Sequence, residues 1–156
     1  IKDGIRLSHA NKYSYKHNDL IDLERHLIRE SGKQIYVVVE SVYSMDGDKC
    51  EVGQLVELCE KQGANLIVDE AHSTGVIGEN GGGMSLNFSN RIFARVFTFG
   101  KAMGVHGACV AGSHLLIQYL INFARPFIYT TAMSDHSLVS IKCAFDYLND
   151  NMDLLK

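Results

Sequence analysis

The sequence predicts an α/β domain in which helices cover both faces of a mostly parallel sheet, a three-layer α/β/α arrangement. Short runs rich in β-branched residues alternate with segments whose apolar residues recur at helical spacing, and that alternation is typical of this class. The chain of 156 residues, with 46% hydrophobic and 21% charged residues, has room for one compact domain with a buried core.

The first half of the chain predicts two helices and two strands. We expect Asn18 to cap a helix that ends before Gly32, because Leu20, Leu23 and Leu27 follow at helical spacing. Residues 35–39 predict a strand buried on both faces. A second helix over 51–62 and a strand over 65–68 follow.

The second half predicts a strand pair and two more helices. Strands over 93–99 and 108–112 are joined by residues 100–107, a connection too short for a helical crossover, so we expect the pair to be antiparallel. Helices over 115–123 and 138–148 follow, and Ser134 is the expected cap of the last one.

Composition narrows the classes of partner and compartment. A net charge of −3 without runs of like charge gives no reason to expect binding to nucleic acid or to an anionic membrane. The four cysteines are widely spaced and predict neither disulfides nor a zinc site, which favours a reducing cytoplasm. No apolar run approaches the roughly 18 to 20 residues of a membrane span, and no signal peptide is recognisable.

Two expected strand ends carry polar residues suited to chemistry. Asp69 and His72 follow the strand over 65–68, and ligands of such sheets bind beyond the carboxyl ends of the strands. A capping Asp and a surface His remain an alternative for this pair alone. Lys101 follows the strand over 93–99, and a partly desolvated lysine there can attack a carbonyl group, although an exposed turn lysine is the commoner explanation.

Four blocks of sequence carry a family resemblance, in order and over nearly the whole chain. The segments ESVYSMDGD from Glu40, DEAHSTGVIGENGGG from Asp69, TFGK from Thr98 and FARPFIYTTA from Phe123 resemble the α-oxoamine synthases. These are fold-type I enzymes that use pyridoxal 5'-phosphate (PLP). The resemblance implies that residues 1–156 form part of the large catalytic domain, with an upstream segment and a C-terminal small domain lying outside this sequence.

The resemblance also implies roles for individual residues. Lys101 resembles the lysine that holds PLP as a Schiff base and moves the substrate's α-proton, and Asp69 resembles the carboxylate that keeps the pyridine nitrogen protonated. His72 resembles the histidine near the phenolic oxygen of PLP, with a structural hydrogen bond as its alternative. Thr98 resembles a phosphate contact and Ser44 a residue of the same pocket, where turn or cap hydroxyls are the alternatives.

Residues near the end of the chain match the family less closely. Thr130 or Thr131 resembles a hydroxyl that reaches the phosphate in the neighbouring subunit of a homodimer. Gly82 stands where relatives often have arginine, and Ser134 and Asp135 replace prolines that are common after the two threonines. These departures do not affect the lysine chemistry.

The implied activity is the condensation of an amino acid with an acyl thioester, with loss of CO2. A sister synthase that uses another amino acid, an aminotransferase-like PLP enzyme and a non-catalytic scaffold of the same fold remain alternatives. We expect no metal, because the histidines show no recognisable ligand spacing. Retention of Asp69, His72, Thr98 and Lys101 together argues against the scaffold.

Overall fold

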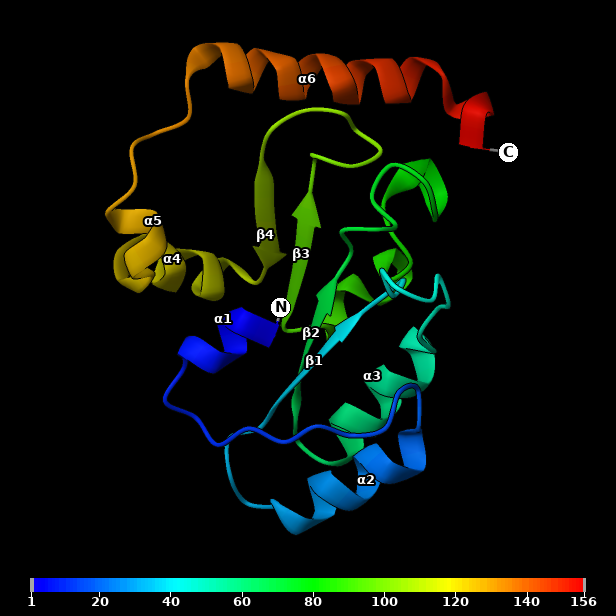
Figure 1. The fold of residues 1–156 in the computed structure, drawn as a ribbon, viewed down its shortest axis with the longest axis vertical. Helices are drawn as coiled ribbons and strands as arrows, with labels where there is room; N and C mark the ends of the chain where they lie inside the picture. The colour runs from blue at the N-terminus through cyan, green and yellow to red at the C-terminus, as the bar shows by residue number, and fades with distance from the viewer. Residues whose placement is uncertain (1, 156) are drawn as a thin grey trace.

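A computed structural model describes residues 2–155, which form a small sheet surrounded by helices (Figure 1). In chain order the elements are α1 (Lys2–Leu7), α2 (Leu20–Arg29), β1 (Tyr36–Glu40), α3 (Val52–Lys61), β2 (Asn65–Asp69), the 3-10 turns η1 (Glu79–Gly81) and η2 (Leu86–Arg91), β3 (Ala94–Thr98), β4 (Ala108–Gly112), α4 (His114–Phe123), α5 (Arg125–Ile128), α6 (Asp135–Asp150) and η3 (Met152–Leu155).

The sheet has the order β1-β2-β3-β4. The first three strands are parallel, with Glu40 opposite Asp69 and Asp69 opposite Val96. Strands β3 and β4 are antiparallel, with Thr98 opposite Ala108, because their connection is a short turn. The predicted mostly parallel sheet and its antiparallel pair are therefore confirmed.

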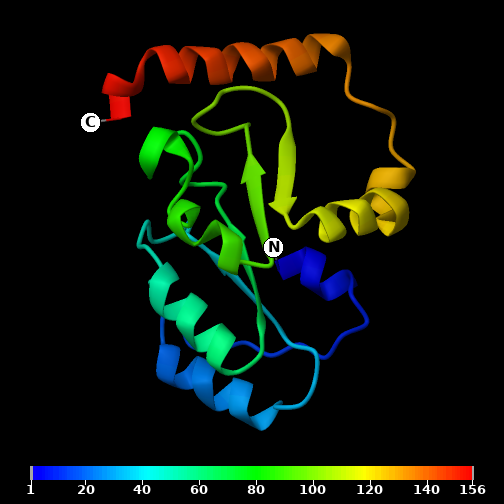
Figure 2. The same cartoon turned by 180° about the vertical axis from the view of Figure 1, so that it is seen from behind.

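Helices α2 and α3 lie side by side against one face of β1 and β2, as the view from behind also shows (Figure 2). Lys61 of α3 reaches Glu24 of α2 at 2.8 Å across their outer surface. The core between these helices and the sheet is made of aliphatic side chains and two thiols: Leu23, Leu27, Val37, Val39, Cys50, Val52, Leu55, Val56, Cys59, Leu66, Val68 and Ile92.

The expectation that the first strand is buried on both faces was wrong. Val37 and Val39 are buried, whereas Tyr36 is 45% exposed and Val38 is only half-buried. Within residues 2–155, β1 is an edge strand, and its alternate side chains Val37 and Val39 face the core shared with α2 and α3.

The start of α2 also differs from the prediction. Asp19, not Asn18, is the N-cap: its side chain accepts a hydrogen bond from the backbone N–H of Asp22. Asn18 has a positive φ of 51° and donates its side-chain amide to Asp48 instead. Both are capping residue types, and the backbone conformation decides between them. The cap at Ser134, which accepts from the N–H of Ser137, is confirmed.

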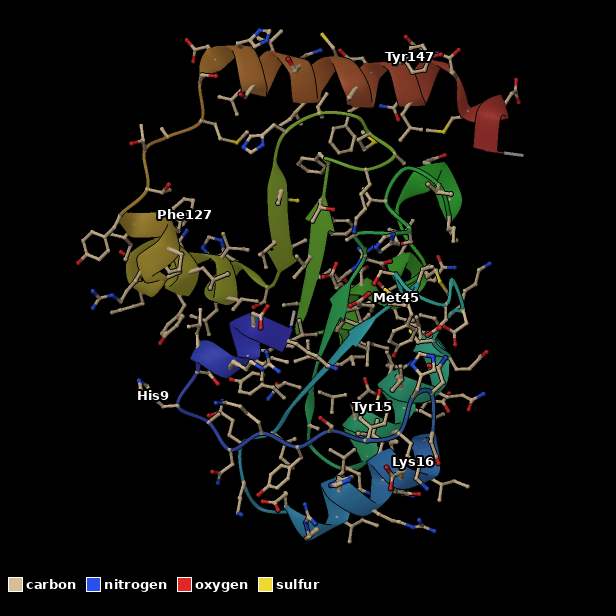
Figure 3. All side chains as sticks on the ribbon, in the orientation of Figure 1. His9, Tyr15, Lys16, Met45, Phe127 and Tyr147 are labelled. Carbon is tan, nitrogen blue, oxygen red and sulfur yellow. The ribbon has the colours of Figure 1, made fainter. Side chains whose placement is uncertain are left out.

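Helix α6 crosses over the turn that joins β3 to β4 (Figure 1). Phe145 of α6 packs edge-on against Phe99 in that turn, with 5.5 Å between the ring centroids. The short helices α1 and α5 were not predicted. Figure 3 shows Phe127 on α5 and Tyr147 on α6 at the periphery of the molecule, and both are more than half exposed. Among residues 2–155, no helix combines the length and apolar character required to traverse a bilayer.

Candidate active site

The parallel strands β1, β2 and β3 end at one edge of the sheet, where the polar residues Glu40, Asp69 and Thr98 lie on the same face. Glu40 is the register partner of Asp69, and Asp69 is the partner of Val96. Thr98 lies two residues beyond Val96, so it projects to the same face as Asp69. This is the edge at which ligands of parallel sheets bind.

Asp69 is followed by a tight turn that fixes its carboxylate. Its Oδ1 accepts a hydrogen bond from the backbone N–H of Ala71 at 2.8 Å, while Oδ2 makes none with the described residues. The backbone N–H groups of Ser73 and Thr74 both donate to the carbonyl of Glu70, which closes the turn around His72. Asp69 therefore keeps one oxygen available to a ligand.

Lys101 and His72 meet across this edge. The Lys101 Nζ lies 2.9 Å from Nε2 of His72, although the two residues are 29 positions apart. An ammonium Nζ donates to Nε2 in the His72 tautomer that carries its proton on Nδ1. The turn from 72 to 75 and the turn from 101 to 104 pack together: a Cβ on Gly75, whose φ is +75°, would lie 2.9 Å from Sδ of Met103.

Thr98 provides a buried hydroxyl without a partner. Its Oγ1 is shielded from solvent and makes no hydrogen bond within residues 2–155. A buried hydroxyl normally finds a partner, because leaving one unpaired costs about 1–3 kcal/mol. The atom lies in the last residue of β3, just before the turn that carries Lys101.

The remaining predicted residues are less closely associated. Ser44 is exposed in the loop after β1, and its backbone N–H donates to Glu40 at 3.3 Å. Thr130 and Thr131 are exposed between α5 and α6, and no side-chain hydrogen bond joins them to the other predicted residues. The structure therefore brings together His72 and Lys101, places Asp69 and Thr98 on adjacent strands, and leaves the two threonines apart from the four.

Glu70, for which the sequence predicts no role, is fully buried, and its side chain points away from the face that carries Asp69. Neighbouring residues at a strand end point to opposite faces, so a second acidic residue directly after Asp69 had to turn inward. The hydroxyl groups of Ser73 and Ser85 donate hydrogen bonds to its carboxylate. The alternation was readable in the sequence, but the distant partners were not.

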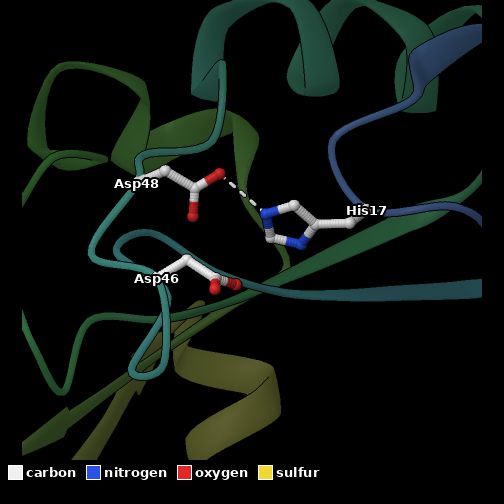
Figure 4. A group of neighbouring side chains, drawn as sticks. All are labelled: His17, Asp46 and Asp48. Carbon is white, nitrogen blue, oxygen red and sulfur yellow. Dashed lines mark hydrogen bonds and ion pairs between the residues drawn. The ribbon is translucent and has the colours of Figure 1, made fainter.

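A separate group of polar side chains lies at the loop after β1 (Figure 4). His17 Nε2 lies 2.7 Å from Oδ2 of Asp48, the same oxygen that accepts from Asn18, and Asp46 is close by. All three potential ligand residues are exposed, and exposed acidic groups are common without an ion. His17 therefore ties its own segment to the loop after β1 through Asp48.

Comparison with known proteins identifies the family. The model of aminotransferase class I and II matches residues 1–153. The chain belongs to this family. An 8-amino-7-oxononanoate synthase from Anaeromyxobacter sp. (strain K) is 43% identical over 135 residues, which cover 85% of this chain and 34% of that protein. The chain therefore spans about a third of the length of this curated relative.

Solved structures of family members share the fold. A high-resolution structure of serine palmitoyltransferase with a PLP internal aldimine is 31% identical, with a TM-score of 0.87 over 94% of this chain and 38% of that one. The 8-amino-7-oxononanoate synthase of Francisella tularensis is 36% identical, with a TM-score of 0.82 over 99% of this chain and 45% of that one. Both are α-oxoamine synthases, so the resemblance and the predicted fold class are confirmed.

Proposed function

We propose that this chain provides the cofactor-binding edge of a PLP-dependent α-oxoamine synthase. The contact between Lys101 and His72, beside Asp69 and the unpaired hydroxyl of Thr98, carries the proposal. A scaffold would have no reason to leave a buried hydroxyl unpaired at the edge where a lysine and a histidine meet. The relatives described above support the same conclusion.

The residues at this edge fit the three ends of PLP. Lys101 Nζ would hold the aldehyde carbon covalently, and Asp69 would pair through Oδ2 with the ring nitrogen. Thr98 Oγ1 would donate to the phosphate. Each group is of the chemical type that its part of the cofactor requires, and Ser44 would complete the pocket from the loop after β1.

When bound, PLP supplies an electron sink for negative charge that develops at the α-carbon of an amino acid. The carboxylate of Asp69 would hold the proton on the ring nitrogen by charge pairing. Lys101 would take the α-proton of the substrate through its Nζ. His72 orients that amine through the 2.9 Å contact. Binding and proton transfer are thus divided among four residues.

The substrates we propose are L-alanine and a pimeloyl thioester. Condensation would give 8-amino-7-oxononanoate, CO2 and the free thiol of coenzyme A or a carrier protein, a step of biotin biosynthesis. The identity to curated 8-amino-7-oxononanoate synthases favours this pair. Serine palmitoyltransferase, with its TM-score of 0.87, makes the corresponding condensation with serine the second candidate.

We further propose that residues 1–156 are part of the large domain of a cytoplasmic homodimer. The aromatic and aliphatic side chains exposed on α4, α5 and α6 are consistent with further burial in a larger assembly. Thr130 and Thr131, which make no side-chain hydrogen bond with the predicted site residues among the described part of the chain, would then face the phosphate in the partner.

The full-length protein, loaded with PLP and reduced with borohydride, tests the site directly. Mass spectrometry should locate the phosphopyridoxyl label on Lys101, and Lys101→Ala should abolish it while leaving the circular dichroism spectrum unchanged. Release of CO2 that depends on both alanine and pimeloyl-CoA would support the synthase. Label at another lysine, or none, would refute the site, whereas transamination without any thioester would favour an aminotransferase.

A further inference from the structure

The most deeply buried charged group of the described chain takes no part in the chemistry proposed above. Glu70 has no exposed surface, and Arg95 on β3 is 7% exposed. Their closest charged atoms are 3.8 Å apart. A carboxylate and a guanidinium removed from water destabilise a fold unless hydrogen bonds satisfy them, so their retention behind a candidate active site needs a physical explanation.

The carboxylate of Glu70 is satisfied from several parts of the chain. The hydroxyls of Ser73 and Ser85 donate to its two oxygens, and the backbone N–H groups of Met84 and Ser85 donate at 3.2 and 2.8 Å. Gly83, with a φ of +89°, passes so close that a Cβ there would lie 2.7 Å from the carboxylate carbon. The loop over 83–85 is therefore shaped around this side chain.

Arg95 extends the network to the glycine segment. Its Nε donates to the hydroxyl of Ser85 at 2.7 Å, and one terminal nitrogen donates to the carbonyl of Gly82 at 2.6 Å. Burial by itself would raise the pKa of Glu70, but hydrogen bonds from Ser41, Ser73 and Ser85 outweigh that effect and the pKa lies below its usual value. The carboxylate is thus ionised and held by donors from three loops.

The backbone and side chain of Glu70 anchor both sides of the turn that carries His72. Its N–H donates to the carbonyl of Val96 at 2.8 Å, which ties the turn to β3. Its carbonyl accepts the N–H groups of Ser73 and Thr74, and its carboxylate accepts the hydroxyl of Ser73. Ser41 closes the other side: its N–H donates to the carbonyl of Asp69 at 2.9 Å and its hydroxyl bonds that of Ser73.

We propose that Glu70 is a positioning residue, whose buried network with Ser73, Ser85 and Arg95 fixes Asp69 and His72 at the angles that the active site needs. This inference rests on the proposed function and adds a residue that touches neither cofactor nor substrate. The geometry supports it because Glu70 lies between the two site residues in sequence, and its main chain bonds Val96 on β3 and the two residues that follow His72, Ser73 and Thr74.

The test compares Glu70→Gln with Glu60→Gln in the full-length protein. Glutamine keeps the shape of Glu70 but places an N–H group where several hydrogen-bond donors converge. Glu60, on α3, is exposed and pairs with Arg91 of η2, so it serves as the control. We expect Glu70→Gln to lower kcat by about 10- to 100-fold, with little change in KM for the thioester, because misplacement of site residues by a fraction of an ångström costs factors of this size. The pH midpoint of the bound cofactor's visible absorbance should shift as well. Glu60→Gln should match the wild type in both.

A purely structural role would lower the melting temperature and leave kcat and the pH midpoint unchanged in the folded protein. That result would overturn the proposal. If Glu70→Gln does not fold, Ser73→Ala decides by the same two measurements, because it removes one donor and keeps the carboxylate.

Hydrogen exchange of the cofactor-free protein separates this inference from the proposed function. Amides of residues 71–75 should exchange faster in Glu70→Gln than in the wild type, while those of β1 stay unchanged. If the wild type gains no phosphopyridoxyl label at Lys101, the proposed function fails, but faster amide exchange in Glu70→Gln would still show that Glu70 holds the turn. Equal amide exchange in the wild type and in Glu70→Gln would refute the positioning role of Glu70.

Discussion

Replacing Thr98 by valine should change stability and cofactor binding in opposite directions. Valine has nearly the shape of threonine and suits a strand, so Thr98→Val removes little except the hydroxyl. That hydroxyl is buried and has no hydrogen-bond partner among residues 2–155. Its removal therefore relieves a cost in the cofactor-free protein and removes a donor from the cofactor-bound one.

The size of each effect follows from the state of the hydroxyl. An unpaired buried polar group costs about 1–3 kcal/mol, so we expect the free energy of unfolding of the cofactor-free protein to rise by about 1 kcal/mol. A hydrogen bond to a charged phosphate contributes about 1.5–3 kcal/mol, so the dissociation constant for PLP should rise by about 10- to 150-fold.

Urea unfolding of the cofactor-free protein and absorbance titration with PLP measure the two effects. Thr74→Val is the matched control, because Thr74 is also buried but its Oγ1 donates to the carbonyl of Glu70 at 2.6 Å. That variant should be less stable than the wild type. The reasoning fails if Thr98→Val destabilises the cofactor-free protein as much as Thr74→Val does, or if it binds PLP as tightly as the wild type.

Three further predictions concern stability and reactivity. Burial raises the pKa of Cys50 to about 12 and that of Cys59 to about 11, so iodoacetamide at pH 8 should modify neither thiol until urea unfolds the protein. Ser134→Ala removes the N-cap of α6 and should cost about 1 kcal/mol in the free energy of unfolding, measured by urea denaturation. The pKa of Glu70 is lower in the folded than in the unfolded protein, so its contribution to stability is present at neutral pH and is lost as the pH falls through the unfolded and then the folded value. Urea midpoints between pH 7 and pH 3 should therefore fall less steeply in Glu70→Gln than in the wild type.

Local signals predicted the mostly parallel sheet and its antiparallel pair, because both depend on connection lengths and on apolar periodicity within single segments. The cap of α2 was misassigned because Asn18 and Asp19 have similar propensities, and the choice depends on the distant partner Asp48. Burial of β1 was overestimated for a related reason. An apolar run shows that a strand is suited to burial on both faces, but the position of β1 at the edge of the sheet leaves Tyr36 exposed and Val38 half-buried.

In the candidate site too, local sequence predicted some features, and contacts between distant residues determined the others. Positions at strand ends predicted that Asp69 and Lys101 lie at the edge where ligands of such sheets bind, whereas Thr98 was predicted from the family resemblance. The contact between Lys101 and His72 depends on how two turns pack, and the role of Glu70 depends on Ser85 and Arg95, which are 15 and 25 residues away. Spacing in the sequence cannot report such contacts, because tertiary packing creates them.

The turn that carries Lys101 is closed by backbone hydrogen bonds from Phe99 to Gly107 and from Val105 to Phe99, both at 2.9 Å. Phe145 of α6 holds the same turn from outside. The main chain at this lysine is therefore fixed, and Nζ can travel only by rotation about the bonds of its own side chain. The amine of Lys101 can therefore leave one bound group and approach another by changing side-chain rotamers alone. Such a movement needs no opening of the loop and breaks none of the backbone hydrogen bonds that close the turn.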